Sequence, residues 1–233
     1  YGTMYNDLLN KFSNLVIECD ERLITLFNNS FKFHKEKFVK LGTHSLDTKK
    51  INNFDYIIYA GSLGKYLRND LNSFSQNPYI KSLENYKDLE LDNILSKTQG
   101  LKIGISWKSL NNRYSSEKSL SLEDFENIFK IKDSTIFNLQ YGDVKDDLKS
   151  FTKKLDYKII TLETLDIFNN FSGLANLLKK LDLFVTVSNS TAHLAGALGV
   201  KTILIKPVNH ASFHYWDYED GKTPWYNNIS IIK

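Results

Sequence analysis

A run of small polar residues follows a strongly apolar segment in the second half of the chain, and its side chains could bind an anion. Leu183–Val187 is apolar or β-branched and leads into the hydroxyl and amide side chains of Ser188–Thr191. The small residues that follow, up to Gly199, are typical of a helix, whose first turn would offer free N–H groups and a favourable dipole. His193, in that turn, could reach the same anion. Ser190 could equally be only a helix N-cap, and His193 a packing residue.

Two further polar segments follow predicted strands and could face the same place. Trp107, Lys108 and Ser109 come after the first apolar strand of the second half, and Gln140 and Tyr141 come after the next one. In doubly wound domains, ligands bind beyond the carboxyl ends of the strands. A lysine ammonium group there would suit a diphosphate. Gln140 could line the same crevice, or it could simply form the turn between strand and helix.

Other kinds of site lack their sequence patterns. The chain contains no G-x-S-x-G, no G-x-x-x-x-G-K-[ST] and no G-x-G-x-x-G after a strand. Cys19 is interpreted as a small buried hydrophobic residue rather than a nucleophile. His210 and His214 have no nearby cysteine and no helical metal-binding spacing, so no metal site is predicted.

The elements expected to position these residues alternate regularly between strand and helix. Strands are predicted over 103–107, 135–139, 157–162, 183–187 and 202–205, and helices from 121 and over 144–154, 174–181 and 192–198. Such alternation, with nearly continuous apolar strands, predicts an α/β domain with a parallel sheet covered by helices on both faces.

The first half of the chain predicts a smaller α/β unit. Helices are predicted over 4–12 and 21–27, and strands over 15–17, 38–41 and 56–59. Residues 69–99 are polar, contain Pro78 and show no sustained periodicity, so they predict a linker. We therefore expect two unequal lobes that meet near residues 97–101, with domains over 1–98 and 99–233.

Composition narrows the class of protein. The 233 residues are 42% hydrophobic and 24% charged, which is typical of a globular protein. The net charge of +3 is better explained by lysines on a solvated surface than by a nucleic-acid partner. The single cysteine, and the lack of a leader or of an apolar run of roughly 20 residues, predict a cytoplasmic protein without a transmembrane segment. The chain begins at Tyr1 rather than Met, so we expect a fragment of a longer protein.

Several segments together resemble a known family of transferases. The stretch from Ile103 to Trp225 resembles the C-terminal half of the glycosyltransferase domain of bacterial tetratricopeptide-repeat proteins, which is related to the family 9 ADP-heptose:lipopolysaccharide heptosyltransferases. The matching segments are Gly104–Lys108, Asn138–Gly142, Leu181–Gly199 and Pro224–Tyr226, and upstream Val16–Cys19 followed by Leu23.

The resemblance implies a GT-B fold, which consists of two Rossmann-like lobes with a nucleotide-sugar in the cleft, and here the N-terminal lobe would be incomplete. It implies catalysis without a metal or other cofactor, and tetratricopeptide repeats elsewhere in the parent chain. It assigns the donor diphosphate to Lys108, Ser190, Thr191 and His193. It assigns the donor sugar or nucleoside to Trp107, Ser109, Gln140, Tyr141, Ser188 and Asn189.

Two departures from the family pattern affect what can be carried over. Heptosyltransferases have an aspartate five residues before the histidine, where this chain has Ser188, so a heptose donor is not assigned. The Gly-rich loop that carries the family's proposed general base would precede Tyr1. We therefore assign no catalytic residue, and we expect poor turnover from these 233 residues.

The function predicted from the sequence is inverting, metal-independent transfer of a sugar from a nucleoside-diphosphate sugar to a hydroxyl of a glycan, a lipid-linked or a protein acceptor. A non-catalytic nucleotide-sugar-binding or protein-interaction domain remains the alternative, and a dinucleotide-dependent oxidoreductase is a weaker one. On the sequence alone, Lys108→Ala and His193→Ala should weaken diphosphate binding more than Ser190→Ala does, because charged hydrogen bonds are the stronger ones.

Overall fold

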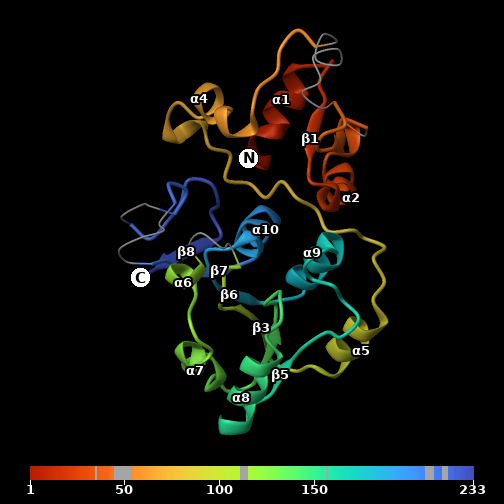
Figure 1. The fold of residues 1–233 in the computed structure, drawn as a ribbon. Helices are drawn as coiled ribbons and strands as arrows, with labels where there is room; N and C mark the ends of the chain where they lie inside the picture. The colour runs from red at the N-terminus through yellow and green to blue at the C-terminus, as the bar shows by residue number, and fades with distance from the viewer. Residues whose placement is uncertain (35, 45–53, 111–114, 156, 208–212, 217–219) are drawn as a thin grey trace.

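The fold contains two separate parallel sheets of unequal size (Figure 1). It is seen in a computed structural model that describes residues 1–34, 36–44, 54–110, 115–155, 157–207, 213–216 and 220–233. The small sheet has two strands, both from the first half of the chain, and the large sheet has six strands, all from the second half. We call residues 1–98 the N-terminal part and residues 99–233 the C-terminal part.

The large sheet reverses its strand order at its centre. Its strands are β3 (Leu101–Ser106), β4 (Ser134–Asn138), β5 (Ile159–Ile160), β6 (Leu183–Val187), β7 (Thr202–Ile205) and β8 (Ile229–Ile232). They lie in the order β5-β4-β3-β6-β7-β8, and all five pairs are parallel. The chain thus runs outward from β3 to β5, returns to β6 beside β3, and runs outward again to β8. This is the doubly wound α/β arrangement, which confirms the predicted fold class of this part.

Helices cover both faces of the large sheet. They are α6 (Ser115–Lys118), α7 (Glu126–Phe129), α8 (Lys145–Leu155), α9 (Phe171–Lys179) and α10 (Ser190–Leu198). Strand residues alternate between the two faces, as the pleat requires. Val185 packs with Phe125 and Phe151 on the α7 and α8 side, whereas Phe184 packs among the residues of α9 and α10.

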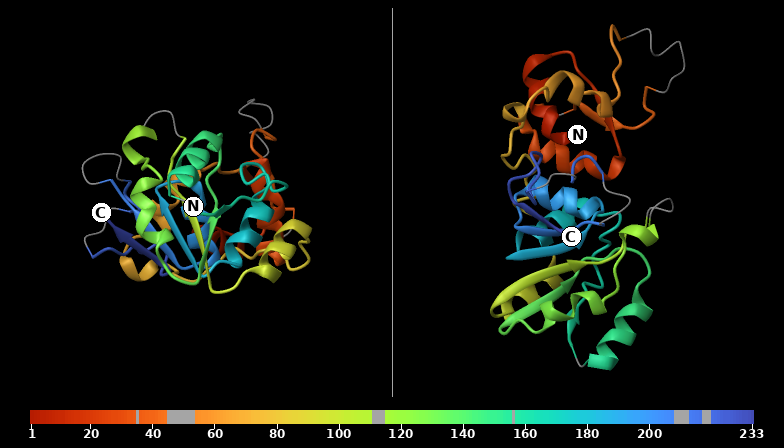
Figure 2. Two further views of the ribbon diagram at one scale, coloured as in Figure 1. Left: turned by 90° about the horizontal axis from the view of Figure 1, so that it is seen from below. Right: turned by 90° about the vertical axis from the view of Figure 1, so that its left-hand side faces the viewer.

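The N-terminal part lies on the α9 and α10 side of the large sheet (Figure 2). Its elements are α1 (Tyr5–Lys11), β1 (Ile17–Cys19), α2 (Glu21–Ser30), β2 (Phe38–Lys40), α4 (Gly64–Leu67) and α5 (Leu89–Lys97). Short 3₁₀ helices cover Gly2–Met4, Lys32–His34, Ala60–Ser62 and Leu71–Ser73, and a fifth covers Glu123–Phe125 in the C-terminal part. β1 pairs with β2 in parallel, and α2 packs against α9.

One hydrophobic core runs through both parts. A single group of buried side chains extends from Met4 and Leu26 in the N-terminal part to Phe184 and Ile231 of the large sheet. The backbone N–H groups of Tyr79 and Ile80 both donate to the carbonyl oxygen of Ala197 in α10, at 3.0 and 3.1 Å. The sheets are separate but the packing is shared, so the predicted domain boundary near residues 97–101 and the two-lobed GT-B arrangement stay predictions.

One expectation for the N-terminal part is wrong. The predicted strand over 56–59 is not formed, and its four large side chains are exposed, Tyr56 by 93%. The run has the composition of a strand, but a strand needs a paired neighbour, and no described strand lies beside it. The predicted linker over 69–99 contains the helix α5, whose N-cap Asp88 accepts a hydrogen bond from Leu91 N.

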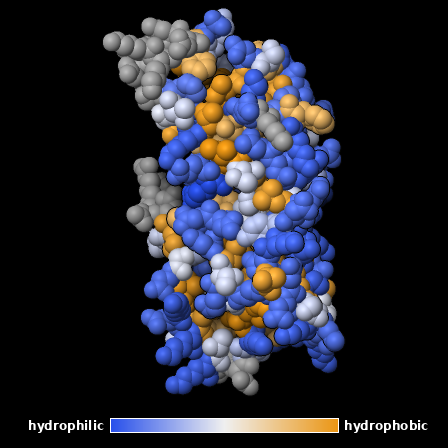
Figure 3. All heavy atoms as spheres, turned by 90° about the vertical axis from the view of Figure 1, so that its right-hand side faces the viewer, coloured by the Kyte–Doolittle hydropathy of each residue, from blue (hydrophilic) through white to orange (hydrophobic). Residues whose placement is uncertain are grey.

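The face drawn in Figure 3 is mainly hydrophilic, and hydrophobic residues form only small groups on it. Among the helices that the structure describes, none combines the length and the apolar character needed to cross a membrane.

Candidate functional site

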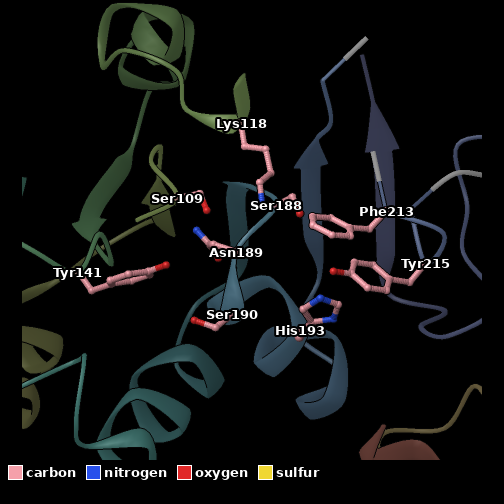
Figure 4. Close-up of a pocket in the computed structure, with 9 residues that line it drawn as sticks. All are labelled: Ser109, Lys118, Tyr141, Ser188, Asn189, Ser190, His193, Phe213 and Tyr215. Carbon is pink, nitrogen blue, oxygen red and sulfur yellow. The ribbon is translucent and has the colours of Figure 1, made fainter. Parts of the chain in front are cut away.

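A cavity of about 250 Å³ lies at the end of the large sheet where β3 and β6 are neighbours (Figure 4). The strand order reverses between these two strands, and in doubly wound sheets that position is the usual ligand site. We call it the main cavity. Its lining residues are Ser109, Lys118, Tyr141, Ser188, Asn189, Ser190, His193, Phe213 and Tyr215.

Asn189 connects helix α10 to the two central strands. Its Oδ1 accepts a hydrogen bond from Ala192 N at 3.1 Å, which caps the helix. Its Nδ2 donates to the hydroxyl oxygens of Ser106 on β3, at 2.9 Å, and Thr186 on β6, at 3.2 Å. The N-cap is therefore Asn189 and not Ser190. Asn189 keeps the start of the helix fixed at the edge of the sheet.

Ser190 is the first residue of α10, and it is exposed at the main cavity. The N–H groups of Ser190 and Thr191 precede the first intrahelical hydrogen bonds, so this end of the helix carries partial positive charge. The Thr191 side chain is buried and borders a second cavity instead. The predicted turn is thus formed, with Ser190 at the main cavity and Thr191 at the second one, and its binding of an anion stays a prediction.

Lys118 supplies the ammonium group of the main cavity. It ends the short helix α6, and only 6% of the residue is exposed. Its Nζ lies 4.5 Å from the centre of the Phe213 ring, a cation–π distance. No carboxylate forms an ion pair with it among the described residues. Burial lowers the pKa of Lys118 from its ordinary value. The sequence gives no signal for this residue, because one lysine among many in a polar loop is not distinctive.

Lys108 does not line the main cavity, contrary to its predicted position. Its Nζ forms an ion pair with Asp147 on α8, and both side chains remain about one-third exposed. The two lysines are ten positions apart, and the one that lines the main cavity is Lys118, at the end of α6. The positive charge expected at the site is therefore present, but Lys118 carries it.

Gln140 and Trp107 are buried supports rather than lining residues. The Oε1 of Gln140 accepts hydrogen bonds from Ser106 Oγ, Trp107 N and Lys108 N, at 3.0, 2.9 and 2.7 Å. These bonds fix the turn that leaves β3. The Trp107 ring is fully buried in the core under α7 and α8. Of the two roles that the sequence left open for Gln140, the structure therefore shows the turn.

Aromatic side chains form two walls of the main cavity. Tyr141 lies on one side, and Phe213 and Tyr215 lie on the other (Figure 4). The rings of Phe213 and Tyr215 are stacked, with centroids 5.3 Å apart. Ser188 accepts a hydrogen bond from Trp216 Nε1 at 3.1 Å, which ties this aromatic loop to the end of β6. A flat or ring-shaped group would fit between such walls.

His193 lines the main cavity as a neutral side chain. Its ring stacks on Trp216, with centroids 4.7 Å apart, and it meets the edge of Tyr215. Desolvation by these rings lowers the pKa of His193 from 6.5 to about 3. Its Nδ1 lies 3.1 Å from the hydroxyl of Tyr226. His193 lies at the first turn of α10, as expected, but the protonated form expected from the sequence is disfavoured here.

A second cavity, of about 110 Å³, adjoins the first and shares Tyr141 and Ser190 with it. We call it the small cavity. Most of the side chains that line it are aromatic or aliphatic. Arg22 of the N-terminal part also lines it. Arg22 does not offer a free charge, because Asp20 accepts hydrogen bonds from its Nε and NH2, at 2.9 and 2.8 Å. Its NH1 donates to the backbone oxygen of Phe168 at 2.9 Å.

Nothing else in the described residues forms an obvious reactive centre. Within them, no group of three or more His, Cys, Asp or Glu side chains could hold a metal ion. Desolvation raises the pKa of the buried Cys19 thiol to about 11, so it is protonated at neutral pH. His210 lies outside the described residues, and His214 packs edge-on against Tyr215.

Comparison with known proteins gives a distant and partial likeness. No protein-family model matches the chain. Over 133 residues, which are 56% of this chain, it is 27% identical to Protein FlbA of Caulobacter vibrioides. The match spans 21% of the length of FlbA, so this chain corresponds to only a small portion of that protein.

Proposed function

We propose that the main cavity binds a nucleoside-diphosphate sugar and that the protein transfers its sugar to an acceptor hydroxyl with inversion and without a metal. One observation carries the proposal: the Lys118 ammonium group and the N-terminus of α10 line one cavity at the reversal point of the sheet. Both place positive charge where a diphosphate would gain most from it. The resemblance to glycosyltransferases of tetratricopeptide-repeat proteins supports the same donor.

The transfer requires stabilisation of the leaving group. The acceptor oxygen forms a bond to the anomeric carbon of the sugar, and the bond from that carbon to the diphosphate breaks. The diphosphate leaves with an added negative charge, which the Lys118 ammonium group and the α10 N–H groups would stabilise. The aromatic walls, Tyr141 on one side and Tyr215 on the other, would hold the base or the sugar ring between them.

The acceptor proton requires a base, and the described lining of the main cavity contains no carboxylate. His193 is a weak base at a pKa of about 3. This observation favours a second candidate function, in which the 233 residues bind the nucleotide-sugar without turning it over. We expect transfer or hydrolysis by this chain to be at least 100-fold slower than in an enzyme with a positioned base. Substantial transfer by the purified chain would show that it contains the base and would exclude the binding-only function.

Calorimetric titration with ADP, UDP and GDP in the presence of EDTA tests the binding site. We expect one of these nucleotides to bind without a divalent ion. Lys118→Gln should weaken its affinity about 10- to 100-fold, the range for a charge-assisted hydrogen bond. Lys108→Gln is the matched control, because it removes a lysine that is paired with Asp147 outside the cavity, and its affinity should equal that of the unmodified chain.

Two results would contradict the proposal. Binding that appears only after Mg²⁺ or Mn²⁺ is added would exclude a metal-free site. A loss of affinity in Lys108→Gln, together with unchanged affinity in Lys118→Gln, would mean that the diphosphate binds at Lys108, as predicted from the sequence. Thermal unfolding of both variants separates a loss of folding from a loss of the site.

A further inference from the structure

Three side chains form a hydrogen-bonded row that leads from the N-terminal part to the wall of the main cavity. Tyr79, in the segment before α5, is hydrogen-bonded through its hydroxyl to Tyr226. The Tyr226 hydroxyl lies 3.1 Å from His193 Nδ1. Tyr226 is buried, and Tyr79 is partly buried, with its ring against Gly2. Only His193 of the three lines the cavity.

The hydrogen atoms of this row can be ordered in two ways. In the first, Tyr79 donates to the Tyr226 oxygen, Tyr226 donates to His193 Nδ1, and the ring proton of the histidine is on Nε2. In the second, His193 Nδ1–H donates to Tyr226, Tyr226 donates to Tyr79, and the Tyr79 proton is left at the end of the row. A neutral histidine has one donor and one acceptor nitrogen, so these two orders correspond to its two tautomers.

The surroundings favour the first order. Tyr226 is buried, so its hydroxyl proton needs an acceptor, and among the described residues His193 Nδ1 lies at hydrogen-bond distance from it, at 3.1 Å. Buried donors are nearly always satisfied, because an unpaired one costs about 1–3 kcal/mol.

We propose that Tyr226, itself oriented by Tyr79, is a positioning residue that fixes neutral His193 as the tautomer with its proton on Nε2, so that this N–H is free to donate to a ligand in the main cavity. The consequence of this His193 tautomer for ligand binding rests on the proposed function. A phosphate or sugar oxygen would accept this hydrogen bond, and no hydrogen bond to Nε2 is formed within the described residues.

Packing holds the row in place. Gly196, in α10, allows the Tyr226 ring to lie directly on the helix, since a Cβ at that position would be 2.6 Å from the ring. The Trp216 ring covers one face of the histidine. The titratable groups that surround the ring are Tyr215, Tyr226, His214, the Tyr1 amino group and, across the cavity, Lys118. Among these groups no carboxylate is available to stabilise a histidinium ion.

Nitrogen NMR of the histidine rings tests the tautomer directly and without a ligand. His193→Gln identifies the His193 signals by their loss. In the unmodified chain at neutral pH, we expect Nδ1 to show the shift of an acceptor nitrogen and Nε2 that of a protonated one. In Tyr226→Phe, we expect His193 to be a mixture of both tautomers. In Tyr79→Phe, we expect the same change to a smaller extent. Tyr66→Phe, at an exposed tyrosine, is the matched control and should change nothing.

A proton on Nδ1 in the unmodified chain, or an unchanged tautomer in Tyr226→Phe, would overturn the proposal. Should Tyr226→Phe fail to fold, the Tyr79→Phe spectrum decides between the two orders. Nucleotide titration is the second readout, and Tyr226→Phe should weaken the affinity about 2- to 10-fold, as for one neutral hydrogen bond. Since the spectra need no ligand, a missing nucleotide affinity in all variants would reject the proposed function and leave the tautomer measurement intact.

Discussion

At the scale of single residues, the site depends on two side chains whose charge states are set by burial. Lys118 lines the main cavity and is almost fully buried, and burial lowers its pKa. His193 loses its charge among aromatic rings. Burial lowers both pKa values from different starting points: the ordinary pKa of a lysine lies far above neutral pH, whereas that of a histidine is 6.5, so the shift leaves His193 neutral.

The low pKa of His193 predicts a specific acid sensitivity. The unfolded chain binds a proton at this residue below pH 6.5, and the folded chain binds it only near pH 3, so stability falls as the pH falls through that window. The loss has a limiting slope of about 1.4 kcal/mol per pH unit. We expect His193→Gln to lose stability less steeply between pH 6.5 and 4, as measured by urea unfolding.

The comparison between the two chains removes the contribution of other groups. Carboxylates with lowered pKa values, such as Glu90 and Asp182, also reduce stability in acid, but they are present in both chains. Parallel stability curves for the two chains would mean that His193 is protonated normally in the folded state.

The polar turn at the start of α10 could be predicted from the sequence, but the side chains that complete the main cavity could not. The turn and the helix start over Ser188–His193 agree with the prediction, because a polar turn before a small-residue helix decides the local structure there. Lys118 and Phe213 were missed because they meet only through the fold, from segments about 95 residues apart. The position of Lys108 was predicted wrongly because its ion-pair partner, Asp147, lies on helix α8, and the sequence does not show that the two residues meet.

At the scale of elements, helix α10 is the part on which the site is built. It begins at its Asn189 cap and ends at Gly199, whose φ of +75° suits glycine. We expect Asn189→Ala to lower the free energy of unfolding by about 1–3 kcal/mol, because it removes the cap and leaves the Ser106 and Thr186 hydroxyls without this partner. Ser190→Ala, at the next position, should change it by less than about 0.5 kcal/mol. Urea unfolding of both variants checks this, and equal losses would mean that Ser190 shares the capping role.

Gly196→Ala should destabilise the protein, although alanine is usually the better residue inside a helix. The added Cβ would be 2.6 Å from the Tyr226 ring and 2.9 Å from Ile229. Overpacking of this kind costs about 1–3 kcal/mol. Gly64→Ala in α4, where a Cβ meets nothing within 4 Å, is the control and should be neutral or stabilising. A melting temperature for Gly196→Ala at or above that of the unmodified chain would contradict the tight contact.

The predicted elements agree with the structure where strands are buried on both faces. The strands β6 and β7 have the predicted bounds, because burial and strand length coincide there. The run over 56–59 has the same apolar and aromatic character, but the structure pairs it with no strand and leaves it exposed. A sequence pattern shows that a segment can form a strand, and only the rest of the fold decides whether a neighbour is present.

At the scale of the whole molecule, the shared core predicts that the two parts unfold together. Leu26, in α2, is fully buried in the same core as the helices that cover the large sheet. Leu26→Ala should cost about 2–5 kcal/mol. All three tryptophans, Trp107, Trp216 and Trp225, lie in the C-terminal part. We expect this N-terminal substitution to shift the fluorescence transition and the circular dichroism transition equally.

Differential scanning calorimetry of the unmodified chain provides the second check, and a single transition is expected. Two separated transitions, or a tryptophan signal that does not respond to Leu26→Ala, would mean that the parts are thermodynamically independent despite their common core.

The reversal of strand order at the centre of the large sheet also determines at which stage of folding the main cavity can form. Ile103 of β3 pairs with Leu183 of β6, about 80 positions later in the sequence, and the main cavity lies at the junction of these strands. Pairings between such distant segments form slowly, because the intervening chain must be ordered first. During refolding, helical circular dichroism should therefore recover before nucleotide binding does. If the proposed nucleotide binds, its binding would then report the arrival of β6 beside β3.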